Sequence, residues 1–320
     1  MGLYVDQKIK ADDASYVGRF APSPTGLLHM GSLITAVASY LDAKANNGRW
    51  LLRIEDVDEI RNQKGAADSI VRVLNDFCFE WDAEIIVQSD RYHMYASVLH
   101  DLIDRGYVYP CGCSRKEIAS LGLLGVDGPI YPGTCRDGLG SGVVPRSWRF
   151  RVVDKVIQFN DLIQGRFQQN LAKEVGDFVL LRADGCWAYQ LAVVFDDAAL
   201  GVTHVVRGSD LLDSTARQIG LQQALNCPAV AYAHVPVLAN QQGEKLSKQT
   251  LAQPLDEGAE SKQLFYALGF LGQNPPSDLL LAPLSELWEW AIAAWDLSKV
   301  PQKRSISVTF KHKNEYKILL

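Results

Sequence analysis

No hydrophobic run in this chain is long enough to cross a membrane. The 320 residues are 48% hydrophobic and 22% charged, which is ordinary for a globular protein. The leader MGLYVDQKIKADDAS has no apolar signal core, and Asp6 stands where a myristoylation signal carries Ser or Thr. We therefore expect a cytoplasmic monomer without membrane contact, made of one large or two modest domains that fold without disulfides.

An excess of positive charge is also missing. The formal net charge is −5, whereas domains that coat nucleic acid by bulk electrostatics are usually strongly basic. This balance excludes such a coating protein. Any contact with RNA is therefore left to a local basic face.

Cysteine is scarce, and its six residues form two groups. Cys111, Cys113 and Cys135 cluster in a short irregular stretch, which in a cytosolic chain indicates a metal site. Structural zinc normally has a fourth Cys or His ligand, and none lies nearby. Three buried cysteines without metal are the alternative, and a catalytic zinc is disfavoured because the stretch offers no adjacent base. The isolated cysteines are typical of a core: Cys78, Cys186 and Cys227.

Strand and helix patterns alternate in the N-terminal part. YVGRF and RWLLRIED predict strands, and the apolar spacing of LITAVASYLDAKA and of residues 70–77 predicts amphipathic helices. This order is typical of an α/β fold with a Rossmann-like, doubly wound parallel sheet. Ligands of such sheets bind at the carboxyl ends of the strands.

Composition and periodicity divide the chain into four parts. Residues 16–105 are predicted to form the first half of the Rossmann-like domain, and residues 150–250 the second half. Between them, residues 106–149 are rich in Gly, Pro and Cys and predict a metal-binding insertion. Residues 251–320 are predicted to form a short helical C-terminal region, although the final stretch KRSISVTFKHKNEYKILL has no assigned structure.

The later segments follow the same kinds of pattern. SWRFRV and the whole of WAYQLAVVFDDAALGVTHVVRGSDLL predict strands, and TARQIGLQQAL predicts a helix. Beyond residue 251, SKQLFYALGFLG and LSELWEWAIAAW predict amphipathic helices. The parallel sheet is expected to close before these helices begin.

Two short motifs far apart in the sequence point to nucleotide chemistry. In APSPTGLLHMGS, His29 and Gly31 stand where an apolar helix begins. A helix N-terminus offers unpaired N–H groups to phosphate, and glycine lets a nucleotide lie directly on the backbone. In KLSKQ, Lys245 and Lys248 supply two ammonium groups that can neutralise a departing pyrophosphate.

These two motifs together resemble the paired signatures of the class I aminoacyl-tRNA synthetases, with the glutamyl branch as the best match. The resemblance continues through RIEDVD, YQLAVVFDD and VVRGSDLL, over roughly residues 18 to 250. Ser32 and Gln249 depart from the general class signature, and both are tolerated within the glutamyl branch. The resemblance implies that His29, Lys245 and Lys248 are catalytic, with His29, Gly31 and Lys248 at ATP.

Glutamate needs partners for both of its charged ends. An arginine fork suits a carboxylate, so Arg207 and Arg19 are candidates for the distal acid, and Glu55 can pair with the ammonium. Structural salt bridges at strand ends are the alternative for these arginines. The resemblance implies a glutamate pocket lined by Arg19, Phe20, Ala21, Pro22, Ser23, Glu55, Tyr189 and Arg207.

The family of small glutamyl-synthetase-like proteins also suggests a fourth metal ligand. It implies that Tyr131 completes the set of Cys111, Cys113 and Cys135 through its phenolate oxygen. A nearby dication lowers the pKa of a bound group, which makes such a ligand chemically reasonable. We therefore expect one structural Zn²⁺.

A full glutamyl-tRNA synthetase has a large anticodon-reading domain after the lysine loop, and residues 251–320 are too few to build one. This truncation resembles the glutamyl-Q-tRNA(Asp) synthetase family. Membership implies that glutamate is activated with ATP and Mg²⁺ without tRNA, then esterified to queuosine in the anticodon loop of tRNA(Asp). The alternatives are a truncated glutamyl- or glutaminyl-tRNA synthetase that charges the 3′ end, and an inert RNA-binding or regulatory relative.

Overall fold

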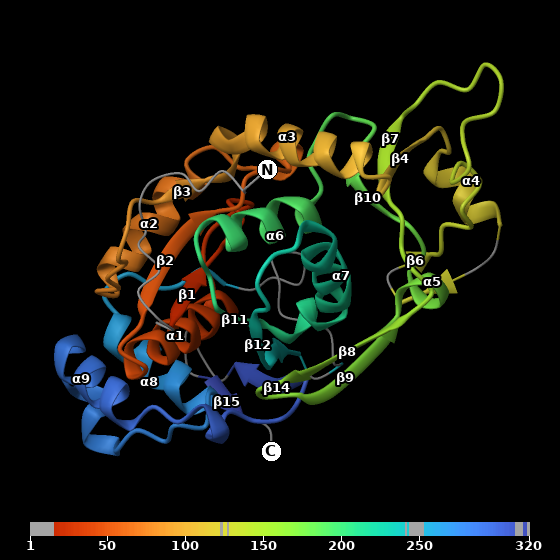
Figure 1. Cartoon of the computed structure of the whole chain (residues 1–320). Helices are drawn as coiled ribbons and strands as arrows, with labels where there is room; N and C mark the ends of the chain where they lie inside the picture. Colours follow the sequence, from red (N-terminus) through yellow and green to blue (C-terminus); the bar gives the residue numbers. More distant parts are fainter. Residues whose placement is uncertain are drawn as a thin grey trace.

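The fold is built around a parallel sheet, shown in the computed structural model (Figure 1), which describes residues 16–121, 124–126, 128–240, 242, 253–310 and 316–318. β2 pairs in parallel with β1 and β3, and β11 pairs in parallel with β12. The N–H of Thr203 donates to the Val17 carbonyl at 2.9 Å, which sets β11 beside β1. The strands are β1 (Val17–Phe20), β2 (Arg49–Ile54), β3 (Ile86–Val87), β11 (His204–Gly208) and β12 (Ala231–Val235). The expected α/β fold with a parallel sheet is confirmed.

Alternation along the strands gives the sheet two different faces. One face carries apolar side chains such as Phe20, Leu52 and Val206, which pack in the main core with helix α1. The opposite face carries Arg19, Arg53 and other charged groups, all of them buried. The helices around the sheet are α1 (Met30–Ala45), α2 (Ala66–Asp76), α3 (Tyr92–Asp104), α6 (Tyr189–Ala199) and α7 (Thr215–Leu225).

Helices α1 and α2 confirm the predictions for the first half of the chain. The apolar positions of α1 are buried, and the helix ends at Asn46, followed by Asn47 with a φ of 52°. This left-handed conformation is one that asparagine tolerates better than most residues. In α2, Ile70 and Leu74 are buried, as the apolar spacing predicts.

The prediction of strands throughout residues 187–212 is wrong. Residues Tyr189–Ala199 form helix α6, whose residues 191–197 are all buried. A continuous apolar run does not distinguish a buried strand from a buried helix by periodicity alone. The strand pattern holds for β11 only.

The middle of the chain contains antiparallel elements. β7 (Ser147–Phe150) pairs with β4 (Val108–Cys111) on one side and with β10 (Phe178–Leu181) on the other. The β8–β9 hairpin (Val156–Asp161 and Gly165–Asn170) follows β7 and, as Figure 1 shows, extends away from the parallel sheet. The short elements of this region are α4 (Arg115–Ser120), β5 (Leu124–Gly125), β6 (Gly128–Pro129) and α5 (Leu171–Glu174).

The C-terminal region contains the predicted helices α8 (Glu260–Phe270) and α9 (Leu284–Ala294), but it is not helical throughout. β14 (Ser305–Phe310) pairs in parallel with β13 (Val237–Ala239) and antiparallel with β15 (Tyr316–Ile318). Ile306 and Val308 are buried and Ser307 between them is less so, which is the period of a half-buried strand. The two predicted helices are confirmed, and the final stretch, to which the sequence pattern assigns no structure, contains the strands β14 and β15.

Short 3₁₀ turns connect several of these elements, and the described ones are η1 (Glu59–Arg61), η2 (Gln88–Arg91), η3 (Ser209–Ser214), η5 (Ser277–Leu281) and η6 (Leu297–Lys299). Helix α9 is held to the core by Trp288, whose indole N–H donates to the Phe77 carbonyl at 2.8 Å. Within the described part of the chain, no helix has the length and apolar character that crossing a membrane requires.

Candidate active site

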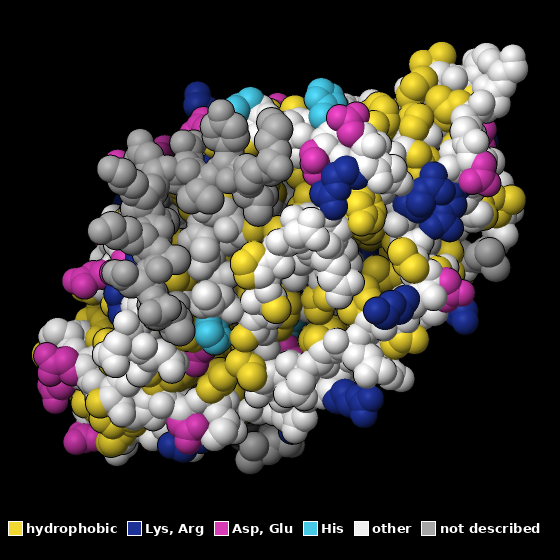
Figure 2. Space-filling model, viewed as in Figure 1, with side chains coloured by type: hydrophobic (Ala, Val, Ile, Leu, Met, Phe, Trp, Pro, Cys, Tyr) yellow, Lys and Arg dark blue, Asp and Glu magenta, His cyan; other side chains and the backbone are white. Residues whose placement is uncertain are grey.

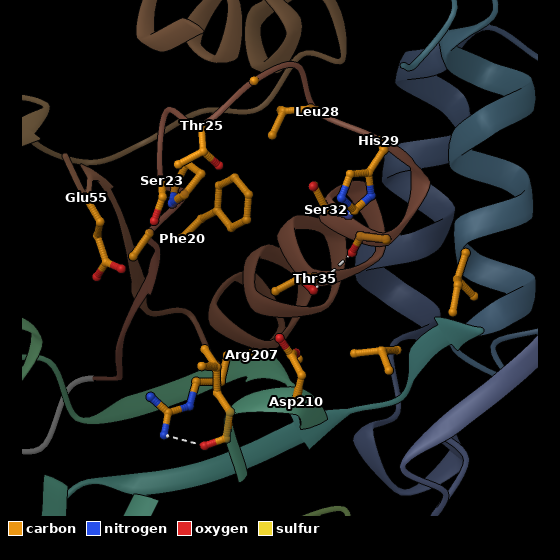
Figure 3. Close-up of a pocket in the computed structure, with 18 of the residues that line it drawn as sticks. Phe20, Ser23, Thr25, Leu28, His29, Ser32, Thr35, Glu55, Arg207 and Asp210 are labelled. Carbon is orange, nitrogen blue, oxygen red and sulfur yellow. Dashed lines mark hydrogen bonds between the residues drawn. The ribbon is translucent and has the colours of Figure 1, made fainter. Parts of the chain in front are cut away.

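A cavity of about 530 Å³ opens at the carboxyl ends of β1, β2 and β11 (Figure 3). His29 and Gly31 line this cavity. So does every residue of the predicted glutamate pocket, namely Arg19, Phe20, Ala21, Pro22, Ser23, Glu55, Tyr189 and Arg207. Figure 3 shows Glu55 and His29 on opposite sides of this cavity, with Arg207 below them. The structure therefore brings these residues together in one place.

The two predicted lysines lie outside the described residues. Both described flanks of their loop nevertheless adjoin the cavity. Leu238, shortly before the loop, lines it, and beyond the loop the Leu255 N–H donates to the Leu28 carbonyl at 3.1 Å. His29 forms a β-bridge with Pro254. The chain that carries Lys245 and Lys248 thus leaves and returns beside the start of α1.

Buried ion pairs connect β1 and β2 to helix α6. Asp197 accepts from Arg19 Nε at 3.2 Å and from Arg53 Nη1 at 2.7 Å. Arg53 Nη2 also donates to Glu55 at 3.0 Å. Glu55 directly follows β2 and lies two residues after Arg53, so the two side chains lie on the same side of the chain. The cluster therefore combines two arginines with two carboxyl groups.

Burial disfavours the charged form of both carboxyl groups in this cluster, but the net pKa shift is upward for Glu55 and downward for Asp197. Burial raises the pKa of Glu55 above its ordinary value, and Arg53 and Arg19 oppose this only in part. Burial also acts against ionised Asp197, but Arg19 and Arg53 outweigh it and hold the pKa of Asp197 below its ordinary value. A cation placed beside Glu55 would favour its charged form.

Arg207 is buried among neutral partners. Its Nε donates to His234 Nε2 at 3.0 Å, and its Nη2 donates to Thr215 Oγ1 at 2.9 Å. Its Nη1 donates to the Tyr189 hydroxyl at 3.3 Å, at the cavity wall. No ion pair between described residues includes Arg207. The guanidinium therefore has no direct ion-pair partner among the described residues, and the Asp161 carboxylate reaches it only through the neutral His234 ring.

The two predicted arginines have different electrostatic roles. Arg19 is 3% exposed and already paired with Asp197, so its charge is compensated. Arg207 is 4% exposed and has no carboxylate partner among the described residues. A buried charge without a direct ion pair is costly, and an anionic ligand in contact with it relieves part of that cost. The arrangement therefore favours Arg207 as the main anchor for a carboxylate.

The start of α1 forms another wall of the cavity. His29 is the N-cap residue, and its Nδ1 accepts from the Ser32 N–H at 3.3 Å. A neutral ring that accepts at Nδ1 carries its proton on Nε2. A Cβ at Gly31 would lie 3.1 Å from the His29 ring, so a side chain there would crowd this histidine. Glycine at this position therefore lets the His29 ring pack closely against the N-terminus of α1.

The three clustered cysteines and Tyr131 lie together in the middle region. The sulfur atoms of Cys111, Cys113 and Cys135 all lie within 4.8 Å of one another, and those of Cys113 and Cys135 are 3.6 Å apart. The Tyr131 hydroxyl lies 3.3 Å from the Cys111 sulfur and 3.8 Å from that of Cys113. Tetrahedral zinc holds two sulfurs about 3.8 Å apart, and a sulfur and an oxygen about 3.5 Å apart. These residues therefore fit a zinc ion.

Burial raises the pKa of the Tyr131 hydroxyl, and two contacts act in the opposite direction, toward negative charge on its oxygen. The Cys135 N–H donates to this oxygen at 2.8 Å. The buried Arg149 guanidinium lies 4.0 Å from the centre of the Tyr131 ring. A donor and a cation both stabilise a phenolate, the form in which tyrosine binds a metal.

Sequence reasoning missed the buried residues that surround the cavity lining. Arg53, Asp197, His234 and Asp161 are buried and ionisable, and none of them was assigned a role. The available signal was charge inside an apolar run, as in RWLLRIED, VVFDDAA and AYAHVPV. Such residues are almost always paired when buried, but their partners lie far away in the sequence.

Comparison with known proteins agrees with this geometry. The family model for tRNA synthetases class I (E and Q), catalytic domain, matches residues 16–122 and 141–274. Glutamyl-Q tRNA(Asp) synthetase of Chromobacterium violaceum is 54% identical over 289 residues, which are 90% of this chain and 96% of that protein. The protein of the same name from Aromatoleum aromaticum is 53% identical over 294 residues, 91% and 93% of the two chains.

Among solved structures, a glutamate tRNA ligase from Elizabethkingia meningosepticum, in complex with its amino acid, aligns with a TM-score of 0.74 at 26% identity. The match covers 91% of this chain and 66% of that ligase. The α/β fold with its parallel sheet is thus that of a class I synthetase. The chain belongs to the class I tRNA synthetases of the E and Q type and, among them, to the family of the glutamyl-Q tRNA(Asp) synthetases.

Proposed function

We propose that this enzyme, a ligase, activates L-glutamate with ATP and transfers it to queuosine in the anticodon loop of tRNA(Asp). The acceptor follows from the name shared by relatives that are 52–54% identical over at least 93% of their own lengths. The observation that carries the amino acid is Arg207, a buried cation with neutral partners at the cavity wall. A ligand with a carboxylate is the occupant that this charge selects.

The cavity offers a partner for each charged group of glutamate. Arg207 Nη1 and the Tyr189 hydroxyl, 3.3 Å apart, would hold the side-chain carboxylate. Glu55 would accept a hydrogen bond from the ammonium. The positive charge of the ammonium would also lower the pKa of Glu55, which burial raises. Residues 20–23 form the wall between β1 and the α1 turn, where the α-carboxylate stays available for reaction.

ATP would lie at the opposite wall, over the start of α1. The N-terminal N–H groups of α1 and the His29 ring would bind its phosphates, and Gly31 allows the close approach. Mg²⁺ bound to ATP would neutralise phosphate charge. The glutamate α-carboxylate attacks the α-phosphate, an oxygen–phosphorus bond forms, and pyrophosphate leaves with the bonding electron pair. A queuosine hydroxyl then attacks the adenylate carbonyl, which releases AMP.

Lys248→Ala tests the activation step. We expect glutamate to drive ATP–pyrophosphate exchange in the absence of RNA, and the variant to slow it about 100- to 1000-fold, as loss of one preorganised charge stabiliser does. Circular dichroism should show an unchanged fold. Lys173→Ala, on an exposed side chain far from the cavity lining, is the matched control. Undiminished exchange in Lys248→Ala would show that pyrophosphate leaves elsewhere.

We further propose that Cys111, Cys113, Cys135 and Tyr131 hold one structural Zn²⁺ within a subdomain over residues 106–149. The sulfur spacings and the two contacts to the Tyr131 oxygen and ring support this. Residues 16–105 and 150–250 would then form the two halves of the catalytic domain, with the lysine loop in the second. Residues 251–320 would form the C-terminal region, and the protein would act as a cytoplasmic monomer.

Metal analysis tests the zinc site. The purified protein should contain about one zinc per chain, because binding energy at a structural site is folding energy. Cys113→Ser should lose the metal and make residues 106–149 sensitive to protease, whereas Cys78→Ser, on an exposed cysteine, should change neither. Tyr131→Phe should weaken zinc retention against a chelator. A metal-free parent protein with a protease-resistant insertion would contradict the site.

The surface is consistent with an RNA partner on one side. In Figure 2, several Lys and Arg side chains lie over the half that carries α7, α5 and the β8–β9 hairpin, with some Asp and Glu side chains among them and others at the α9 end. These Lys and Arg side chains offer local positive charge to RNA despite the net charge of −5. An anticodon arm would approach the cavity from that side.

A further inference from the structure

A chain of buried polar side chains lies behind Arg207. Arg207 Nε donates to His234 Nε2 at 3.0 Å, and His234 Nδ1 lies 2.5 Å from Asp161 Oδ2. His234 lies on β12, beside Arg207 on β11, and Asp161 is the last residue of β8. His234 and Asp161 are not part of the cavity wall. His234 contacts the candidate ligand anchor from behind, and Asp161 contacts His234.

Hydrogen-bond chemistry determines where the His234 proton lies. An arginine only donates, so His234 Nε2 must be unprotonated to accept from Arg207. The proton of the neutral ring therefore lies on Nδ1, which donates to Asp161. Burial lowers the pKa of His234 to about 4, although Asp161 opposes this, so the ring is neutral near neutral pH.

The Asp161 carboxylate is itself held in one orientation. Its Oδ1 accepts from the backbone N–H groups of Ile163, Gln164 and His234 at 3.0, 2.8 and 3.1 Å. This leaves Oδ2 to accept from the His234 ring. The orientation of the Asp161 carboxylate thus keeps the His234 proton on Nδ1. Nε2 is then left unprotonated and can accept the hydrogen bond from Arg207.

We propose that Asp161 and His234 are positioning residues that orient the Arg207 guanidinium toward the side-chain carboxylate of glutamate, an inference that rests on the proposed function. With Nε held by His234 and Nη2 by Thr215, the planar guanidinium directs Nη1 to the cavity beside Tyr189. Without the Nε contact, the group keeps Thr215 and the longer contacts to the Leu211 carbonyl and the Tyr189 hydroxyl, which fix its plane less firmly. The carboxylate partner would then be misplaced although the charge remains.

Asp161→Asn separates orientation from packing because the amide has the same shape. Asn Oδ1 keeps the three backbone contacts, so the amide NH₂ faces His234 Nδ1 as a donor. The ring must then carry its proton on Nε2, where it opposes the Arg207 Nε–H. We expect the KM for glutamate in pyrophosphate exchange to rise about 10- to 100-fold, the range for a lost hydrogen bond to a charged group. The KM for ATP and kcat at saturating glutamate should stay near the parent values.

Nitrogen-15 NMR reads the tautomer directly. In the parent protein, His234 should show a protonated Nδ1 and a bare Nε2, and Asp161→Asn should reverse this. The chain has six histidines, and the signal missing in His234→Gln identifies His234. A merely structural role would lower the folded fraction without moving either the tautomer or the glutamate KM.

A pair of His234 variants keeps the test sharp if Asp161→Asn does not fold. Phe keeps the aromatic ring beside Tyr232 but offers Arg207 no acceptor, whereas the amide oxygen of Gln can replace Nε2. We expect His234→Phe to reproduce the rise in glutamate KM and His234→Gln to stay near the parent value. His204→Gln is the control. His204 is the first residue of β11, and its ring stacks on that of Tyr16, which directly precedes β1.

Two results would overturn the proposal: an unchanged glutamate KM in folded Asp161→Asn or His234→Phe, or a His234 ring that keeps its protonated Nδ1 in Asp161→Asn. Failure of the proposed function looks different. In that case the parent protein shows no glutamate-dependent exchange, while the NMR comparison still decides whether Asp161 sets the His234 tautomer.

Discussion

Replacing Arg207 with methionine is expected to raise the KM for glutamate in pyrophosphate exchange by about 30-fold or more, because removing one partner of a buried charge pair costs about 2 to 5 kcal/mol. The KM for ATP should not change, since the wall proposed to bind ATP lies across the cavity at His29. Arg207→Lys should be nearly as damaging. A single ammonium does not donate in the planar arrangement that reaches His234, Thr215 and Tyr189 together.

Glutamate titrations by exchange assay and by calorimetry measure this effect. Arg304→Met is the matched control, because Arg304 is an exposed arginine paired with Asp213 and is not part of the cavity wall. A glutamate affinity that is the same in Arg207→Met and the parent protein would assign Arg207 to structure alone.

Arg53→Met is expected to reduce the free energy of unfolding by about 3 to 5 kcal/mol, the cost of breaking a buried ion pair by removing one partner. Arg53 is fully buried between Asp197 and Glu55. After the substitution, Asp197 keeps Arg19, but Glu55 loses its direct partner and remains in a site where burial already raises its pKa. Urea denaturation measures the change.

An exposed ion pair provides the comparison. Lys173 and Asp154 lie 4.0 Å apart with both side chains exposed, and such pairs contribute about 1 kcal/mol or less. Lys173→Met should therefore leave the urea midpoint nearly unchanged. Equal urea midpoints for Arg53→Met and Lys173→Met would mean that the buried ion pairs of Arg53 with Asp197 and Glu55 do not stabilise the fold.

Local pattern predicted the elements that line the cavity better than the contacts behind it. The positions of Arg19 and Glu55 at the cavity are predictable, because their strands end at the same edge of a parallel sheet. The position of His29 is predictable because α1 begins at that edge. Asp197, the buried partner of Arg19 and Arg53, is not predictable in this way. It lies 178 residues from Arg19 and 144 from Arg53, on a helix whose continuous apolar run also fits a buried strand.

The C-terminal strands show a second limit of local pattern. Ile306 and Val308 alternate with polar residues, which is the strand period, but the stretch is short and its parallel partner β13 lies far back in the chain. The Arg207, His234 and Asp161 contacts have the same origin. Each pair joins different strands, so only the tertiary fold pairs them, and Arg207 alone of the three is a candidate from the sequence.

The position of transferred glutamate on tRNA tests the central claim most directly. Labelled glutamate, ATP and queuosine-containing tRNA(Asp) should give a labelled RNA whose label, after nuclease cleavage, stays with the anticodon-loop fragment. Prior periodate oxidation of the queuosine diol should abolish labelling, and an unmodified transcript should accept none. Label on the 3′-terminal adenosine of a glutamate or glutamine tRNA would contradict the account and identify an enzyme that charges the acceptor end.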